Sequence, residues 1–254
     1  MFGPHDGKRV AVHPYRRMMS FLMRGRNESA VFFEQRLDLA RTQPWLTARG
    51  AKLFPLILHA LATTLHDRPH LNRFTVGTRT YQRTGVRLSF AAKKQMAEDA
   101  PLATVKRQFE PGEDLAAVTR ALDAELSGAR ADGPSAMDKE LKTLLALPGF
   151  LLAFGIAVLG RLYRWGLAPR SLVDTDPMYA SAFVANLGSV KLDAAFHHLY
   201  EHGNCPLFVT VGRVTDGTLL MRYTFDERVE DGMYCARALD LFRQRVEDPA
   251  SWIA

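Results

Sequence analysis

The sequence predicts an α/β sandwich, in which one mixed β-sheet is covered by helices. Helical and strand-like segments alternate irregularly along the chain, which is typical of this class. No internal repeat or low-complexity tract interrupts them. The 254 residues are enough to bury one sizeable core. We therefore expect a single domain over residues 1–254.

The first third of the chain predicts a helix, a strand and a second helix. Residues 14–25 form a short amphipathic stretch that begins at a proline and ends at a glycine. Residues 29–41 are rich in β-branched and aromatic side chains, which favours a strand. Residues 51–67 carry a leucine or isoleucine every four residues, which indicates a strong helix that Pro69 ends.

The middle of the chain predicts a hairpin and a further helix. Residues 79–93 have the pattern of two strands that turn at Thr84 and Gly85. Residues 114–129 have helical periodicity, and we expect a loop from there to residue 138.

The apolar stretch 143–160 is the unusual part of the sequence. It carries no charge, and its 18 residues lie at the lower edge of the length that spans a membrane. Pro148 and three glycines weaken it as a helix. We expect a helix that is buried or contacts another subunit, and not a transmembrane one. The alternative is an anchor to a membrane surface through 143–165, with aromatic and arginine side chains at the interface.

The last third of the chain predicts three strands and a closing helix. The turn signal Asp216-Gly217 marks a tight hairpin between the second and third strands. The helix at 233–246 has a periodic apolar face. The three strands are expected at 180–188, 206–214 and 218–225.

Charge and cysteine content narrow the class of protein. The net charge is +6, but the basic residues are interleaved with acidic ones, and we find no nucleic-acid-binding motif. We expect no nucleic-acid partner; a groove for a phosphate-bearing cofactor fits the same charge. The two cysteines form no CxxC pair and the N-terminus has no apolar signal region, which together predict a reduced, cytoplasmic protein.

The segment TLLMRYTFDERVEDGMYCARALDLFRQRVEDP at 218–249 carries a resemblance. It is similar to the end of the acyltransferase catalytic domain of 2-oxo acid dehydrogenase complexes, a family similar in fold to chloramphenicol acetyltransferase. The family signature is a strand, then Asp-His-Arg-x-x-Asp-Gly, then a helix. The matching residues are Asp226, Arg228, Asp231 and Gly232, and Glu227 stands at the histidine position.

Upstream segments resemble the same family in the same order. AFVANLGSVKLDAAF resembles its Ser-Asn-Leu-Gly segment, CPLFVTVGRV its Ala-Val-Gly-Arg strand, and KLFPLILHALATTLHDRPHLNRF its helix before a Pro-x-x-Asn turn. The likeness covers about residues 14–250. Residues 130–178 match poorly, which predicts a branch-specific hydrophobic helical segment at about 135–178.

The resemblance implies acyl transfer between coenzyme A and a thiol or hydroxyl acceptor, in a channel between the subunits of a homotrimer. In that family an imidazole takes the acceptor's proton, and a serine or threonine hydroxyl donates to the oxyanion. The second aspartate of the motif, here Asp231, braces the fold by pairing with an arginine, for which Arg16 and Arg17 are the candidates. The apolar segment 143–160 becomes a candidate wall for an acyl chain.

The sequence departs from the family at both chemical positions. Glu227 replaces the base, and Ala185 stands where the resemblance puts the oxyanion serine. We expect Glu227 and Asp231 at the catalytic positions. The residues expected to bind substrate are Ala185, Asn186, Gly188, Arg228 and Gly232.

Two functional hypotheses follow from these departures. The first is a catalytically degenerate protein that binds an acyl thioester such as acyl-CoA, an acyl carrier or another protein partner in the old channel. The second is an active coenzyme A-dependent acyltransferase in which burial raises the pKa of Glu227 until it serves as the base.

The histidines at 197–203, in HHLYEHG, are a weaker candidate site. The segment imitates a His-His-x-x-x-Asp-Gly motif, but it precedes the VTVGR strand instead of following the last strand. His198 and His202 have the i,i+4 spacing of zinc ligands on a helix, without a third ligand placed by the sequence. We interpret this segment as a polar surface turn and expect no metal site.

Overall fold

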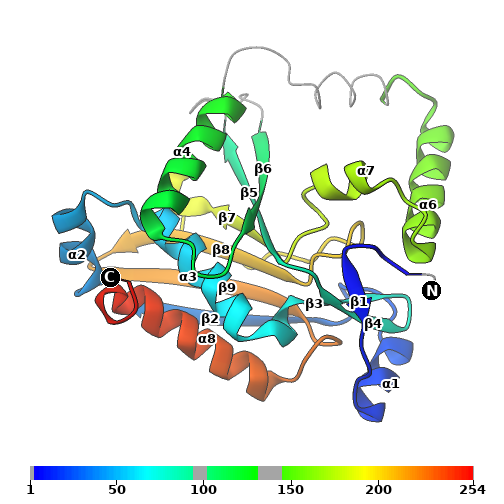
Figure 1. Ribbon diagram of the computed structural model, residues 1–254, viewed down its shortest axis with the longest axis horizontal. Coiled ribbons are helices and arrows are strands. Elements are labelled where there is room, and N and C mark those ends of the chain that lie inside the picture. Colours follow the sequence, from blue (N-terminus) through cyan, green and yellow to red (C-terminus); the bar gives the residue numbers. More distant parts are fainter. Residues whose placement is uncertain (1–2, 94–101, 131–144, 254) are drawn as a thin grey trace.

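The computed structural model describes residues 3–93, 102–130 and 145–253, and its main feature is a six-stranded mixed sheet (Figure 1). The strand order is β2-β9-β8-β7-β5-β6. β7 runs parallel to both of its neighbours, and the other pairs are antiparallel. The bounds are β2 Ala30–Asp38, β5 Val86–Lys93, β6 Leu102–Phe109, β7 Ala182–Asn186, β8 Leu207–Thr215 and β9 Thr218–Asp226.

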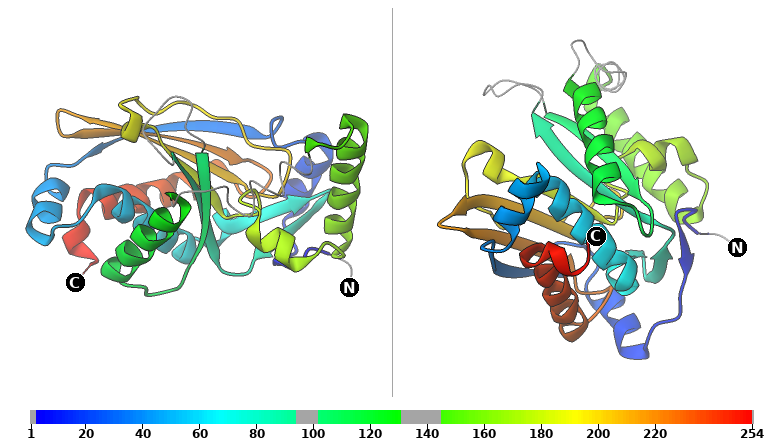
Figure 2. Two further views of the ribbon diagram at one scale, coloured as in Figure 1. Left: turned by 90° about the horizontal axis from the view of Figure 1, so that it is seen from above. Right: turned by 60° about the vertical axis from the view of Figure 1, so that its left-hand side comes forward.

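Three helices cover one face of this sheet, so the predicted α/β sandwich is confirmed (Figures 1 and 2). The largest core cluster lies between them and the strands, and includes Leu58, Phe90, Val209 and Phe242, each at most 1% exposed. The helices are α3 Leu53–Asp67, α4 Leu115–Arg130 and α8 Gly232–Glu247. The helix α2 Thr42–Arg49, which the sequence did not predict, precedes α3.

The opposite face of the sheet is crossed by the segment 191–206, which contains no helix or strand (Figure 2). Hydroxyls of the sheet hold it: Thr210 Oγ1 donates to the backbone oxygen of Ala195 at 2.7 Å, and Thr224 Oγ1 to that of His197 at 2.6 Å. The His197 ring stacks on Phe208 with centroids 3.8 Å apart. This face therefore has a thin covering of chain in place of a helical layer.

A second, three-stranded sheet corrects the predicted hairpin at 79–93. β4 (Arg79–Arg83) pairs with β3 (Arg73–Val76) and β1 (Gly7–Arg9), whereas β5 belongs to the large sheet. Thr84 and Gly85 therefore carry the chain from one sheet to the other. Thr-Gly is a turn signal both within a hairpin and between two sheets, so the local sequence could not distinguish a hairpin from a crossing between sheets. The predicted hairpin at Asp216-Gly217 is confirmed, with both residues at positive φ (49° and 73°).

The apolar helix α6 (Gly149–Trp165) corrects the expectation of burial. Its side chains are largely exposed: Phe150 is 73%, Phe154 66% and Ile156 51% accessible. Only its last turns pack, where Tyr163 is buried beside the short helix α7 (Arg170–Thr175). None of the helices in the described residues has the length and apolar content needed to span a bilayer. Residues 135–144 of the predicted hydrophobic segment, and the loop predicted up to residue 138 beyond residue 130, lie outside the described residues.

Candidate functional site

The motif begins where β9 ends, at the edge of the sheet next to α1 (Pro14–Leu22). The backbone of Glu227 is held on both sides: its N–H donates to the oxygen of Ser29 at 2.9 Å, and its own oxygen accepts from the guanidinium of Arg16. The Glu227 side chain is half-buried and makes no hydrogen bond or ion pair with any residue that the structure describes. Its carboxylate is therefore available to a ligand or a neighbouring molecule.

A buried ion pair within the motif fixes this corner. Arg228 holds Asp226 through two parallel bonds, Nη2 to Oδ2 at 2.6 Å and Nε to Oδ1 at 2.8 Å. The hydroxyls of Ser29 and Thr75 also donate to the Asp226 carboxylate. Both charged side chains are at most 4% exposed, so the pair is a structural brace and Arg228 is not free to bind an anion on its own.

The second aspartate has a different role from the one expected. Asp231 is exposed and caps α8, where its Oδ1 accepts the N–H of Tyr234 at 2.8 Å. The pairing with Arg16 or Arg17 is not formed in the described residues, because Arg16 reaches the backbone of Glu227. The brace is supplied by Asp226 instead. The sequence contained this signal, since Asp226 and Arg228 both match the motif, but spacing alone could not say which carboxylate turns inward.

The predicted residues Ala185, Asn186 and Gly188 lie elsewhere on the sheet. Ala185 is opposite Thr210 on β8, whereas β9 ends opposite the beginning of β8. At about 3.3 Å per residue, the two sites are separated by roughly 15 Å along the sheet. Glu227 and Ala185 therefore do not meet within one chain.

A pocket of about 330 Å³ lies beside Asn186 and Gly188. The side chain of Asn186 caps the following turn by accepting the N–H of Ser189 at 3.2 Å. A Cβ on Gly188 would stand 2.3 Å from the backbone oxygen of Gly212, so only glycine fits there. Leu53, Phe54 and Ile57 of α3 form an apolar wall of the pocket. At Gly232, in contrast, a Cβ would meet open space.

The histidine segment does not form the helix that zinc-ligand spacing requires. His198 bonds through Nδ1 to the backbone oxygen of Leu199, and His202 through Nε2 to Asp176 at 2.8 Å. In the described part of the chain, no group of three metal-ligating side chains comes together.

Comparisons with solved structures place this fold among acyltransferases. The dihydrolipoamide acetyltransferase of Azotobacter vinelandii, whose catalytic mechanism has been studied at a serine, a histidine and an asparagine, is 16% identical, with a TM-score of 0.57 over 95% of this chain and 93% of that one. A chloramphenicol acetyltransferase is 15% identical, with a TM-score of 0.58 over 95% and 98%.

A truncated catalytic core of the 2-oxoacid dehydrogenase multienzyme complex of Thermoplasma acidophilum is 13% identical, with a TM-score of 0.58 over 94% and 98%. No protein-family model and no curated protein sequence matches this chain. The chain thus has the fold of these acyltransferases, and similarity at this level of identity shows the fold alone.

Proposed function

We propose that this chain is an acyltransferase-fold binding protein that has lost ordinary acyl transfer. Its ligand is an acyl thioester, an acyl carrier or another protein partner, held in the channel that the related fold forms between subunits. The observation that carries the proposal is Ala185. Its methyl group stands on β7 where the resemblance puts a hydroxyl donor, and loss of one such donor typically costs about 10²–10³ in rate.

The pocket beside Gly188 suits coenzyme A. Its apolar wall at Phe54 and Ile57 fits a pantetheine chain, and Arg213 at the same pocket offers a cation to a phosphate. Arg213 already contacts Asp193 at 3.3 Å, but both side chains are about half-exposed, so this pair can exchange for a phosphate at little cost. When bound, coenzyme A would supply the thiol or thioester; the chain's residues would hold it.

A homotrimer would join the two separated parts of the site. Glu227 of one subunit and the pocket beside Gly188 of the next would then face a shared channel. Apolar side chains exposed on or beside the thinly covered face of the sheet support this arrangement, since Phe32, Leu192 and Phe196 are each about half-exposed. Light scattering should give three times the chain mass, and a clean monomer at micromolar concentration would contradict the trimer.

The active alternative makes Glu227 the general base. Its carboxylate is half-buried and unpaired within the described residues, so a neighbouring subunit could desolvate it and raise its basicity toward a thiol. The base would take the thiol proton while the sulfur attacks the thioester carbonyl, and the tetrahedral intermediate would then expel the coenzyme A sulfur, which receives the proton from the base. Ala185 would still leave the oxyanion without its hydroxyl donor.

A thiol-release assay with acetyl-CoA distinguishes the two. We expect wild type to be inert and the double replacement Glu227→His with Ala185→Ser to gain activity. Turnover by wild type that Glu227→Gln abolishes would establish the alternative. Binding of coenzyme A, measured by calorimetry in parallel, reports on the channel whatever the acceptor, and Gly188→Ala is expected to remove it.

The exposed face of α6 favours a second candidate function, attachment to a membrane surface. Phe150 and Phe154 could enter the interface, with Arg161, Arg164 and Trp165 at the level of the head groups. Co-sedimentation with anionic and neutral vesicles tests it. If the protein attaches to membranes, it should bind anionic vesicles more strongly than neutral ones, and Phe154→Ser should weaken this binding. Equal amounts of protein in the supernatant with and without vesicles would exclude attachment.

A further inference from the structure

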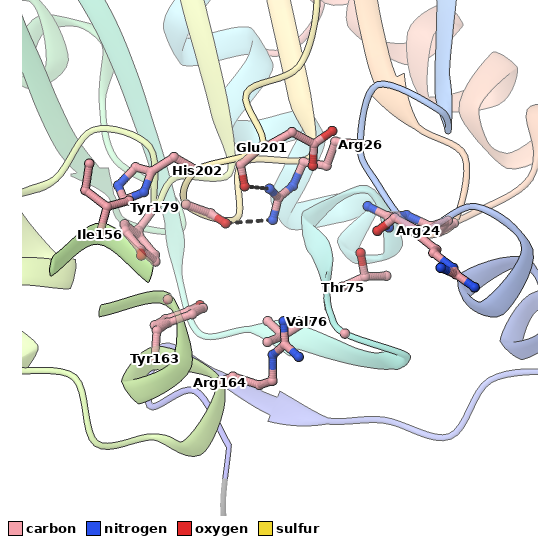
Figure 3. A pocket seen from close by; sticks show the side chains of 14 residues that line it. Arg24, Arg26, Thr75, Val76, Ile156, Tyr163, Arg164, Tyr179, Glu201 and His202 are labelled. Carbon is pink, nitrogen blue, oxygen red and sulfur yellow. Dashed lines mark hydrogen bonds between the residues drawn. The ribbon is translucent and has the colours of Figure 1, made fainter. Parts of the chain in front are cut away.

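A second pocket, of about 400 Å³, lies between α6, the turn after β3 and the loop at 200–203 (Figure 3). It is separate from the pocket beside Gly188 and shares no lining residue with it. Arg228 is the one motif residue on its wall. The binding of coenzyme A proposed above makes no use of this pocket.

The floor of the pocket is built around a buried arginine. Arg26, only 6% exposed, donates to the backbone oxygens of Tyr200 (3.1 Å), Glu201 (2.7 Å) and Gly203 (2.7 Å), two of which are drawn in Figure 3. These bonds hold a loop without regular structure in one shape. Burial lowers the pKa of Arg26, because desolvation disfavours the guanidinium, and an anion beside it would offset that cost.

The same loop presents an oriented histidine to the pocket. His202 bonds through Nε2 to Asp176 at 2.8 Å, and its ring meets Tyr179 edge-on. Gly203 locks the loop in place, since φ is +77° and a Cβ would lie 2.3 Å from the oxygen of Met178. Because the carboxylate of Asp176 accepts from Nε2, the ring's other nitrogen is left to interact with a ligand.

The charge of the pocket is strongly positive. Four arginines line it, and Glu201 is the one carboxylate among the lining residues. Arg228 is neutralised by Asp226, but Arg24 and Arg164 pair with no carboxylate in the part of the chain that the structure describes. Figure 3 shows Arg164 across the pocket from Arg26, with Arg24 at the rim. This arrangement suits a phosphate group, which takes several guanidinium donors.

Part of the pocket wall is apolar. Ile156 and Gly160 of α6 line the pocket together with Val76. A Cβ on Gly160 would meet no atom within 4 Å, so the pocket is open above this position. Ile156 is half-exposed, so the apolar wall continues onto the surface of the helix. A chain attached to the phosphate could therefore lie against the helix.

We propose that this pocket binds a phosphate monoester that carries an apolar chain. The phosphate lies between Arg164 and Arg26, within reach of Arg24 and His202, and the chain lies along α6 at Gly160 and Ile156. Both a free phosphopantetheine that carries an acyl chain and a lysophosphatidic acid present this chemistry.

Calorimetric titration with octyl phosphate tests the proposal on the full chain. We expect wild type to bind octyl phosphate and Arg164→Gln to bind it at least tenfold more weakly, since a charge-assisted bond to phosphate is lost. Arg161→Gln is the matched control on the same helix, because Arg161 does not line the pocket, and it should bind as wild type does. Octyl glucoside, which has the same chain without the charge, should bind at least tenfold more weakly than octyl phosphate.

Two glycine variants test the position of the chain. Gly160→Leu adds a side chain where a Cβ meets no atom within 4 Å, and leucine favours a helix more than glycine does, so the protein should stay folded and lose binding. Gly155→Leu also projects into open space but lies off the pocket, and should keep binding. Equal affinity of wild type, Arg164→Gln and Gly160→Leu, or no binding of octyl phosphate to folded wild type, would overturn the proposal.

Octanoyl phosphopantetheine and a short-chain lysophosphatidic acid then distinguish the two sources of the phosphate ester. The compound that binds wild type and no longer binds Gly160→Leu is the one that the pocket accepts. If Gly188→Ala removes coenzyme A binding and Gly160→Leu leaves it intact, the proposed channel and this pocket are distinct sites. The proposed function and the phosphate pocket can then each be wrong without the other.

Discussion

The helices α3 and α6 are both long and apolar, yet their surroundings are opposite. α3 lies on the large sheet and buries a continuous run of side chains from Pro55 to Ala62. α6 stands at the edge of the molecule and buries Tyr163 alone (Figure 1). Apolar composition alone therefore does not predict whether a helix is buried. Burial depends on whether the fold places other parts of the same chain against its apolar side.

A single polar cluster explains how α6 stays attached with so little burial. The hydroxyl of Tyr163 donates to Asp6 Oδ1 at 2.8 Å, and the amide of Asn204 contacts the same hydroxyl. Asp6 Oδ2 accepts from Arg83 at 2.9 Å in a fully buried pair. The C-terminal end of α6 is thus held by hydrogen bonds, which leaves its apolar remainder to a ligand, a membrane or another subunit.

The largest effect on stability is expected from a substitution in α3, the packed helix. Leu58→Ala in α3 removes a side chain that is 0% exposed, and we expect it to lower the free energy of unfolding by about 2–5 kcal/mol. Phe154→Ala in α6 should change it by less than about 0.5 kcal/mol, because that side chain is exposed. Urea unfolding measures both. Equal losses at a concentration where the protein is monomeric would show that α6 packs within its own chain.

A smaller effect is expected at the attachment of α6. Tyr163→Phe leaves Asp6 and Asn204 short of a partner in a buried cluster, which should cost about 1–3 kcal/mol and speed amide exchange in α6. Tyr179→Phe is the matched control, since that hydroxyl makes no hydrogen bond with a described residue and the ring is equally buried. If the two variants lose the same stability, the polar cluster does not hold the helix.

The pH dependence of stability tests the neighbouring helix α7. Lys106 donates to the backbone oxygens of Val173 (2.7 Å) and Asp176 (3.0 Å), and burial lowers its pKa from 10.5 to about 8. The native state therefore loses this proton at a lower pH than the unfolded chain, so the lysine's contribution to stability rises between pH 8 and pH 10.5. Wild type should gain stability relative to Lys106→Met over that window. A difference that shrinks with pH would contradict the assignment.

The smallest effect is expected in the thiol reactivity of the two cysteines, which lie on opposite faces of the large sheet. Cys235 lies on the buried side of α8, where burial raises the pKa of its thiol to about 12. Cys205 lies within the segment 191–206 and is also buried, which raises the pKa of its thiol. At pH 8, Cys235 should hold about a thousandfold less thiolate than a free thiol. A disulfide reagent should label neither in minutes and both in urea. Earlier labelling of Cys205 would show that the thinly covered face opens first.

Local patterns were enough for most of the elements. The helix predicted at 51–67 is α3, and the strands predicted at 206–214 and 218–225 are β8 and β9 to within a residue. The strand β6 was missed because its sequence, LATVKRQF, shows no clean alternation of apolar and polar residues and has Lys106 next to Arg107. Its cover comes from α4, which follows it in the chain. The exchange of partners at Gly85 was missed because pairing depends on distant strands.

The candidate site was only partly within reach of the sequence. The resemblance singled out Asp226, Glu227, Arg228 and Ala185, because it rests on residue identity. It could not say that Asp226 would be buried against Arg228 while Asp231 caps a helix, since side-chain direction depends on the packing around each carboxylate.

The sequence by itself determined the α/β class, the order of the main elements and the presence of an alanine at position 185, because periodicity and residue identity are local properties. Only the tertiary structure decided which apolar helix is covered, how far Glu227 lies from Ala185, and that Arg26, Arg164 and His202 converge on one pocket. These features join residues that are distant in the sequence, and their relative positions are set only when the strands pair in their final order.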